Sequence, residues 1–236
     1  MKLLMKPAIA LVFAGLIPVS AATIQAKYEG YYGGTVKMST NSGGSYATVG
    51  GGIFFFERTG GTYNDGPAIG EDYYAMCIEP WEWISSGATH TWNVQTLPQG
   101  NTFGTFSTAK VDLLSELFGR YWPDFDVLLS PKQEALALQI AVWEIVGETS
   151  GTFNLTGGVM RFKDASIANT ISRASTMLSS LDGTGPKAQG LMVMEKRGVQ
   201  DYVFQITTTP PQEVPEPTHL LGIGLAALAL LKRRLG

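Results

Sequence analysis

Apolar residues recur every three or four positions in three segments near the middle of the chain, a spacing typical of helices with one buried face. The predicted helices cover residues 108–118, 130–146 and 164–181. Ser107 or Thr108 suits the N-cap of the first helix and Asp164 that of the third, because short polar side chains accept hydrogen bonds from the free N–H groups of the first turn.

The second of these helices is the most clearly marked. Ser130 suits its N-cap, Pro131 suits the first helical position because its missing N–H would be unpaired there anyway, and Gln133 has capping-box spacing. Gln139 interrupts the apolar pattern, since the positions three and four residues away on either side are all apolar. A buried amide without partners costs about 1–3 kcal/mol. Gln139 must therefore find a partner or react.

Short β-prone runs surround the helical region. Before it, residues 35–38, 45–49 and 53–56 alternate with glycine-rich turns. The run 50–52 is predicted to form a turn or bulge rather than a phosphate-binding loop, because no lysine and helix follow it. A further strand carries Cys77 and ends at a turn at Pro80.

After residue 80 a loop is predicted over 85–104, and two closing strands over 191–194 and 202–207, joined by a turn at 196–198. Strands at both ends of a helical middle predict an α+β fold: a β-sandwich or barrel-like sheet with an inserted helical subdomain of about three helices. This domain is expected to span residues 27–207.

The N-terminal 22 residues have the plan of a secretory signal peptide: two lysines, an apolar run, and a stretch of small residues at Ser20-Ala21-Ala22. Cleavage is compatible with the chain after Ala21, Ala22 or Ala26. We therefore expect the protein to leave the cytoplasm.

The C-terminal segment also has the features of a targeting signal. A proline-rich linker over 208–217 leads to Pro215, Glu216 and Pro217, then to an apolar run over 220–231 and a terminal basic cluster. The run is short for a membrane span, and the basic cluster would stay on the cytoplasmic side. The segment 214–236 resembles the PEP-CTERM sorting tail. This resemblance implies processing by an exosortase-type enzyme, a membrane contact through the tail, and export through the inner membrane of a Gram-negative bacterium.

The net charge limits the kinds of partner that the protein is expected to bind. Without the five basic residues of the two terminal segments, 12 basic residues face 20 acidic ones, a net charge of −8. Such a balance disfavours a nucleic-acid partner. One cysteine and one histidine in the body also cannot form a closed zinc site, so we expect neither a metal nor another cofactor.

Cys77 is the only cysteine of the chain, so it cannot form an internal disulfide. Four interpretations remain open. It is a buried structural thiol, half of an interchain disulfide, a nucleophile with His90 as its base, or one partner of an internal thioester with Gln139. A thioester would explain the lone thiol and the buried amide together, and would need protection from water by aromatic residues such as Tyr74, Trp81 and Trp143.

A family resemblance favours the thioester. Tyr74-Ala-Met-Cys77-Ile-Glu-Pro80, a two-leucine helix at 113–114, and Leu138-Gln139-Ile-Ala141-Val-Trp143 together resemble the thioester domains of bacterial surface adhesins. The resemblance implies that Cys77 and Gln139 are the bonded pair. Ala141 and Trp143 would then shape the floor of the site.

The sequence therefore predicts an exported surface or matrix protein that attaches itself once, without turnover, to an amine-bearing macromolecule. It is not expected to be an enzyme. Glu79, Glu144 and His90 are candidates for proton transfer. The alternative is a non-covalent structural or carbohydrate-binding component of an exopolysaccharide matrix, in which exposed tryptophans stack on sugars.

Overall fold

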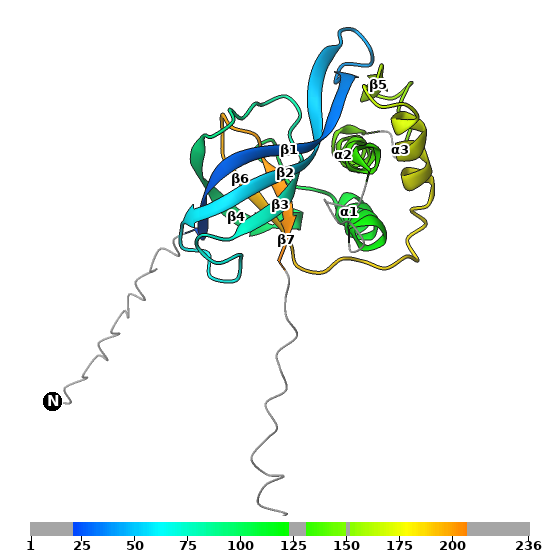
Figure 1. Ribbon diagram of the computed structural model, residues 1–236. Helices are drawn as coiled ribbons and strands as arrows, with labels where there is room; N and C mark the ends of the chain where they lie inside the picture. Colours follow the sequence, from blue (N-terminus) through cyan, green and yellow to red (C-terminus); the bar gives the residue numbers. More distant parts are fainter. Residues whose placement is uncertain (1–20, 123–130, 150–151, 207–236) are drawn as a thin grey trace, which may run out of the picture.

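The computed structural model describes residues 21–122, 131–149 and 152–206. The predicted signal segment up to residue 20, the linker and the sorting motif at Pro215, Glu216 and Pro217 lie outside these residues, as does the predicted cap Ser130. The described chain forms a β-barrel with a layer of helices on one side (Figure 1).

Six strands make the barrel. They are β1 (Thr23–Ser39), β2 (Ala47–Gly60), β3 (Asp72–Cys77), β4 (Thr89–Thr96), β6 (Leu191–Glu195) and β7 (Tyr202–Gln205). The strand order is β2-β3-β7-β6-β4-β1, every neighbouring pair is antiparallel, and the pairing of β1 with β2 closes the barrel. The short β5 (Arg161–Lys163) pairs with the far end of β1. The predicted α+β fold with a barrel-like sheet and inserted helices is confirmed.

Aromatic side chains fill much of the barrel. The ring centroid of Phe56 lies 4.9 Å from that of Tyr202 and 5.7 Å from that of Trp92, with both pairs edge-on. All three side chains are fully buried, and the Trp92 N–H donates to the backbone carbonyl of Gln200. Edge-to-face packing of this kind adds to the hydrophobic gain, so the barrel is a packed core.

Three α-helices form the layer beside the barrel: α1 (Thr108–Tyr121), α2 (Lys132–Gly147) and α3 (Thr170–Ser179). A short 3₁₀ turn, η1 (Leu97–Gln99), precedes them. In Figure 1 α2 lies between the barrel and α3. Every residue of α2 from 135 to 146 is buried, because the barrel covers one side of this helix and α1 and α3 cover others.

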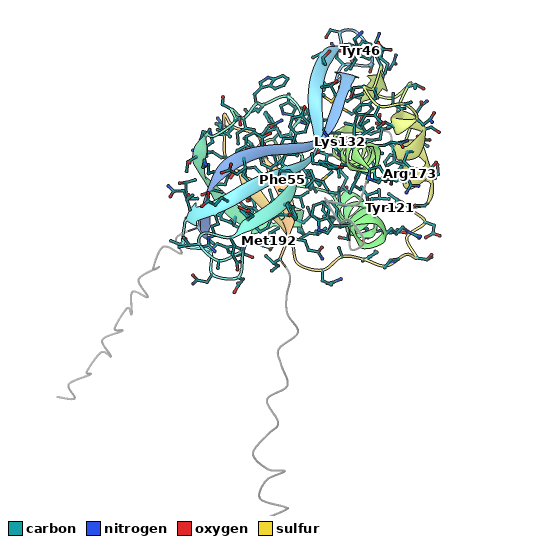
Figure 2. All side chains as sticks on the ribbon, viewed as in Figure 1. Tyr46, Phe55, Tyr121, Lys132, Arg173 and Met192 are labelled. Atoms are coloured by element: carbon teal, nitrogen blue, oxygen red, sulfur yellow. The ribbon has the colours of Figure 1, made fainter. Side chains whose placement is uncertain are left out.

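Arg173 ties the helical layer together. Its Nε donates to both carboxylate oxygens of Glu134 on α2 at 2.9 Å, and its guanidinium carbon lies 5.5 Å from the ring centroid of Tyr121 on α1. Figure 2 labels Arg173 and Tyr121 on these facing helices. A single cation on α3 therefore contacts both of the other helices.

The helix starts differ in part from the predictions. Ser107 is the N-cap of α1 and accepts a hydrogen bond from Lys110 N, as expected. Pro131 lies one position earlier than predicted, at the N-cap of α2 instead of the first helical position.

The prediction that Asp164 caps the third helix is wrong, because α3 begins only at Thr170. Asp164 has a positive φ of 49° and forms an ion pair with Lys37 on β1 at 2.9 Å. Two residues later, Ser166 N donates to Thr35 O and Ser166 Oγ accepts from Thr35 N. This segment therefore binds the edge of β1 instead of starting a helix.

The predicted loop over 85–104 is wrong, because it contains β4. Along this strand Trp92 and Val94 are buried while Thr91 and Asn93 are exposed, the two-residue alternation of a half-buried strand. The predicted turn or bulge at 50–52 is also wrong. These glycines pair in register with residues 33–35 inside the long β1–β2 ladder.

The N-terminal half of β1 is part of the barrel. Thr23 to Ala26 pair with β4, and Ile24 and Ala26 are fully buried. Cleavage after Ala26 would remove these pairs, whereas cleavage after Ala21 or Ala22 would leave β1 complete.

Candidate functional site

Cys77 is the last residue of β3, where α2 crosses the end of the strand. It pairs with Tyr202 of β7, and its side chain is completely buried as a free thiol. Gln139, near the middle of α2, is also fully buried. The structure therefore brings together the two residues that the sequence predicted to meet.

The Gln139 carboxamide binds both backbone groups of Cys77. Its Oε1 accepts from Cys77 N at 3.0 Å, and its Nε2 donates to Cys77 O at 2.7 Å. The amide thus forms the two backbone hydrogen bonds that a neighbouring strand would otherwise supply to Cys77. The buried polar atoms of Gln139 therefore have partners. Because both bonds go to one residue, the Gln139 carboxamide lies against the backbone of Cys77.

A glycine in β2 makes the close approach of α2 possible. A Cβ atom at Gly51 would lie 2.8 Å from Cη2 of Trp143 and 3.1 Å from Cγ of Gln139. The first distance is too short for any side chain to be tolerated unless the Trp143 indole or the helix moves. Gly51 is therefore a site residue that the sequence analysis missed, although the triple-glycine run inside a β-prone stretch was a signal of close backbone approach.

The surroundings of Cys77 keep its thiol protonated. Burial raises its pKa to about 12, and the negative charges of Glu79 and Asp201 act in the same direction. Opposing contributions come from the nearby Trp143 indole and from Glu79 N, which donates to Sγ at 3.4 Å. Trp143 Nε1 itself makes no hydrogen bond of ordinary geometry. A thiol in this state reacts only if another group takes its proton.

Glu79 is the acidic group beside the thiol. Its side chain is fully buried, Oε2 accepts from Asp201 N at 3.2 Å, and Oε1 has no hydrogen-bond partner. Burial, followed by the charges of Asp201 and Glu82, raises the pKa of Glu79 to about 8, although the nearby Trp81 indole opposes this shift. At neutral pH Glu79 therefore exchanges readily between its acid and its carboxylate.

The other candidates for proton transfer lie elsewhere. Glu144 has a pKa raised to about 7 by burial, but its Oε1 accepts from Asn154 N at 2.8 Å, in a loop on another side of α2. His90 lies on β4 and packs edge-on against Trp92, with a pKa lowered by burial and by Lys196. Of the three, only Glu79 has a charge that raises the pKa of Cys77.

The predicted site-shaping residues divide into two groups. Trp81 and Trp143 lie at the site, beside Glu79 and Cys77 respectively. Tyr74 is 47% exposed and packs on Phe55 on the outer face of the sheet. Ala141 is buried two positions after Gln139, and residues two apart on a helix do not face the same side.

A pocket of about 180 Å³ lies beside Trp143. Its walls come from β1, β2 and the turn after β3, including Tyr31, Gly50 and Pro80. Trp143 is the only α2 residue in its lining, so this pocket borders the same indole that lies beside the Cys77 sulfur.

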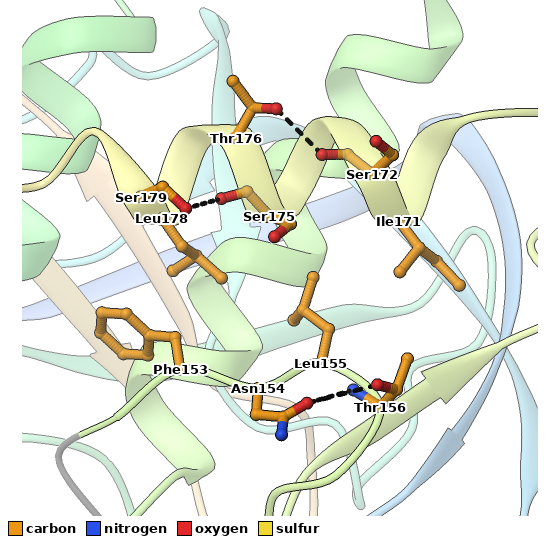
Figure 3. A pocket seen from close by; sticks show the side chains of 10 residues that line it. All are labelled: Phe153, Asn154, Leu155, Thr156, Ile171, Ser172, Ser175, Thr176, Leu178 and Ser179. Carbon is orange, nitrogen blue, oxygen red and sulfur yellow. Dashed lines mark hydrogen bonds between the residues drawn. The ribbon is translucent and has the colours of Figure 1, made fainter.

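A second and larger pocket, of about 610 Å³, lies between α3 and the loop before β5. Its lining includes four hydroxyl residues of α3 (Ser172, Ser175, Thr176 and Ser179) and the loop residues Phe153, Asn154 and Leu155, all labelled in Figure 3. Two of the hydroxyl groups donate to carbonyls one turn back, Thr176 to Ser172 O and Ser179 to Ser175 O, so their oxygens still have lone pairs to accept with.

Within residues 21–122, 131–149 and 152–206, no three His, Cys, Asp or Glu side chains form a group suited to a metal ion. No helix in the same ranges combines the length and apolar character needed to cross a membrane. Comparison of the chain with protein-family models, with curated proteins and with solved structures gives no match.

Proposed function

We propose that Cys77 and Gln139 form an internal thioester, and that the protein uses this bond once to attach itself to an amine-bearing surface or matrix macromolecule. The observation that carries the proposal is the double hydrogen bond between the Gln139 carboxamide and the backbone of Cys77, in a fully buried site. Proximity of this kind makes an otherwise slow reaction effectively intramolecular.

The bond forms by attack of Sγ on the carboxamide carbon of Gln139. The S–H and C–N bonds break, the S–C bond forms, and ammonia leaves. Negative charge develops on Oε1 during the attack, and the N–H of Cys77 already donates to this atom at 3.0 Å. A fixed donor at the oxygen that gains charge stabilises the transition state.

Glu79 moves the proton in this scheme. Its carboxylate takes the proton of the Cys77 thiol, and the resulting acid returns it to the departing nitrogen. The unpartnered Oε1 and the pKa of about 8 support this role, because a proton-transfer group works best when its pKa lies near the ambient pH.

The thioester then reacts with a primary amine of the partner. The amine nitrogen attacks the Gln139 acyl carbon, a stable amide forms, and Cys77 regains its proton as a free thiol. The chain is consumed as a reagent and does not turn over. The two terminal segments support export through the inner membrane of a Gram-negative bacterium, exosortase-type processing and a surface or matrix location.

Intact mass spectrometry of the mature protein tests the thioester. The expected mass is lower than that of the chain by one ammonia, and Cys77 resists alkylation in denaturant. Cys77→Ala and Gln139→Ala lose the deficit, whereas Gln133→Ala, a change at a partly exposed glutamine of the same helix, keeps it. A full mass with an alkylatable Cys77 would rule the thioester out and leave a buried structural thiol.

The hydroxyl-lined pocket along α3 favours a second function, non-covalent binding of carbohydrate. Ser172, Ser175 and Thr176 offer oxygen acceptors, and Phe153 offers an aromatic face. Binding of the producer's own polysaccharide that is reversible, unaffected by Cys77→Ala and lost on Phe153→Ala would support this function.

A further inference from the structure

The pocket beside Trp143 is aromatic on most sides. Its aromatic residues are Tyr28, Tyr31, Phe54, Trp83 and Trp143. None of the lining residues is a lysine, arginine, aspartate or glutamate. Trp83 is 63% exposed and Tyr31 is 41% exposed, whereas Trp143 is almost fully buried. The pocket therefore runs from exposed aromatic rings inward to the indole of α2.

Its inner end is Trp143, which lies next to both residues of the proposed bond. Trp143 is one helical turn after Gln139, so the two side chains lie on the same side of α2. An added Cβ at Gly51 would meet both Trp143 and Gln139 Cγ, so these two α2 side chains cover the same point of β2. Cys77 is also close enough to Tyr28 to raise the pKa of that phenol. Cys77 and Gln139 do not line the pocket themselves; it ends at the Trp143 indole, which lies beside them.

Two acidic residues lie in the turn that forms part of its wall. The turn that contributes Pro80 and Trp83 to the pocket also carries Glu79 and Glu82. Each of these carboxylates has one buried oxygen without a hydrogen-bond partner, Oε1 in Glu79 and Oε2 in Glu82. Unpaired buried acceptors close to an uncharged cavity favour a ligand that brings a proton donor, as an amine does.

We infer that this pocket receives the alkyl chain of the attacking amine, and that it selects a lysine side chain or a linear polyamine over short amines. The inference rests on the proposed thioester. A lysine side chain is a flexible four-carbon stem with a terminal nitrogen. The volume of about 180 Å³ is room for such a chain, being roughly six water molecules at ~30 Å³ each.

The apolar walls of the pocket act on both the methylene stem and the nitrogen of the amine. Burying each methylene of the stem strengthens binding by about fourfold. An uncharged, aromatic-lined site also disfavours the ammonium form of an entering amine through desolvation, which increases the fraction of free base that can attack. The cation–π attraction of the exposed outer rings, Tyr31 and Trp83, first draws the charged form to the mouth.

Rates of adduct formation with methylamine and butylamine, followed by intact mass on full-length mature protein, test the inference. The wild-type protein is expected to react with butylamine on the order of tenfold faster or more, since three more methylenes are buried. Trp83→Ala and, separately, Tyr31→Ala should reduce this preference for butylamine over methylamine to about threefold or less. Tyr74→Ala, which removes an exposed aromatic ring outside the pocket, should keep the full preference.

The outcomes separate the two proposals. A wild-type protein with the ammonia deficit that reacts equally with both amines overturns the pocket assignment alone. So does an unchanged preference in both Trp83→Ala and Tyr31→Ala. A wild-type protein without the deficit overturns the thioester itself, and the pocket assignment with it.

Discussion

The carboxylate of Glu79 accepts a hydrogen bond from the backbone N–H of Asp201, 122 positions later in the chain, and both acidic side chains are fully buried. Asp201 has partners for its own charge, since its carboxylate accepts from Thr102 N, Thr102 Oγ1 and Lys196 N. Glu79 has one oxygen without any partner. Burial of the two carboxyl groups therefore destabilises mainly the ionised form of Glu79.

Glu79 is expected to make the fold less stable as pH rises. Its pKa is about 8 in the folded protein against an ordinary 4.5, so between these values the folded chain binds more protons than the unfolded chain. Its stabilising contribution is complete below pH 4.5 and is lost as pH rises through about 8. A pKa difference of one corresponds to about 1.4 kcal/mol, so the loss should reach a few kcal/mol.

Urea denaturation at pH 5 and pH 8 measures this effect, best in a Cys77→Ala background where no thioester contributes. Glu79→Gln should make the difference between the two pH values smaller. Part of the difference should remain, because the pKa values of Glu144 and Asp201 are also raised by burial. Equal pH dependence with and without Glu79→Gln would contradict the prediction.

Glu79→Gln is also expected to slow thioester formation by about 100-fold or more, the usual contribution of a proton-transfer group. The measurement is the time course of ammonia loss after refolding. Glu144→Gln is the matched control, because Glu144 is a buried glutamate with a raised pKa and one unpartnered oxygen, but it faces Asn154. In the wild-type protein the rate should rise with pH up to about 8 and then level off. Equal rates in the two variants would remove Glu79 from the mechanism.

Gly51→Ala is expected to disturb the site through the position of α2. The added Cβ would lie 2.8 Å from Trp143 and 3.1 Å from Gln139, so these side chains or the helix itself must move away from β2. Overpacking of this kind costs about 1–3 kcal/mol, and the shift should also weaken the bonds between Gln139 and Cys77. Gly60→Ala, in the same strand, meets only the flexible end of Gln25 and should be tolerated. Equal stability and equal thioester yield in both variants would show that α2 does not need the close approach.

Gln139 is expected to stabilise the fold even without covalent chemistry. In a Cys77→Ala background, Gln139→Ala leaves the backbone N–H and C=O of residue 77 without partners, at a cost of about 1–3 kcal/mol for each buried group. Gln133→Ala, at a partly exposed position of the same helix, should change the free energy of unfolding by less than about 0.5 kcal/mol. Urea denaturation of the two double variants gives both values; a cost at Gln139 no larger than at Gln133 would contradict the prediction.

The parts of the fold that local sequence determines were predictable. Ser107 caps α1 through its own side chain, and the apolar spacing placed all three helices in the middle of the chain. The prediction of the helix start at Asp164 failed because contacts between residues distant in the sequence determine the structure there. Asp164 has the side chain of a helix cap, but the ion pair with Lys37, 127 positions away, holds it at the edge of β1. The strand β4 was a different kind of error, because its alternating burial was present in the sequence and was not recognised.

The candidate site also has parts that could be predicted from the sequence and parts that could not. The meeting of Cys77 with Gln139 was predictable because an amide in an apolar helix needs a partner, and the resemblance to thioester domains pointed to the lone cysteine. The role of Gly51 depends on a helix about 90 positions later, and the partnership of Glu79 with Asp201 depends on the closing of the barrel. Neither relationship has a counterpart in local spacing.

The place of β7 in the barrel sets the order in which the site is assembled. This strand is the last one in the described chain, yet it lies between β3 and β6, and its first residue, Tyr202, is the neighbour of Cys77. As a growing or translocating chain emerges from its N-terminus, Cys77 and Gln139 both appear before the strand that covers them. The fully buried position of Cys77 is therefore complete only once β7 has joined the barrel, and the proposed thioester is expected to form only after that step.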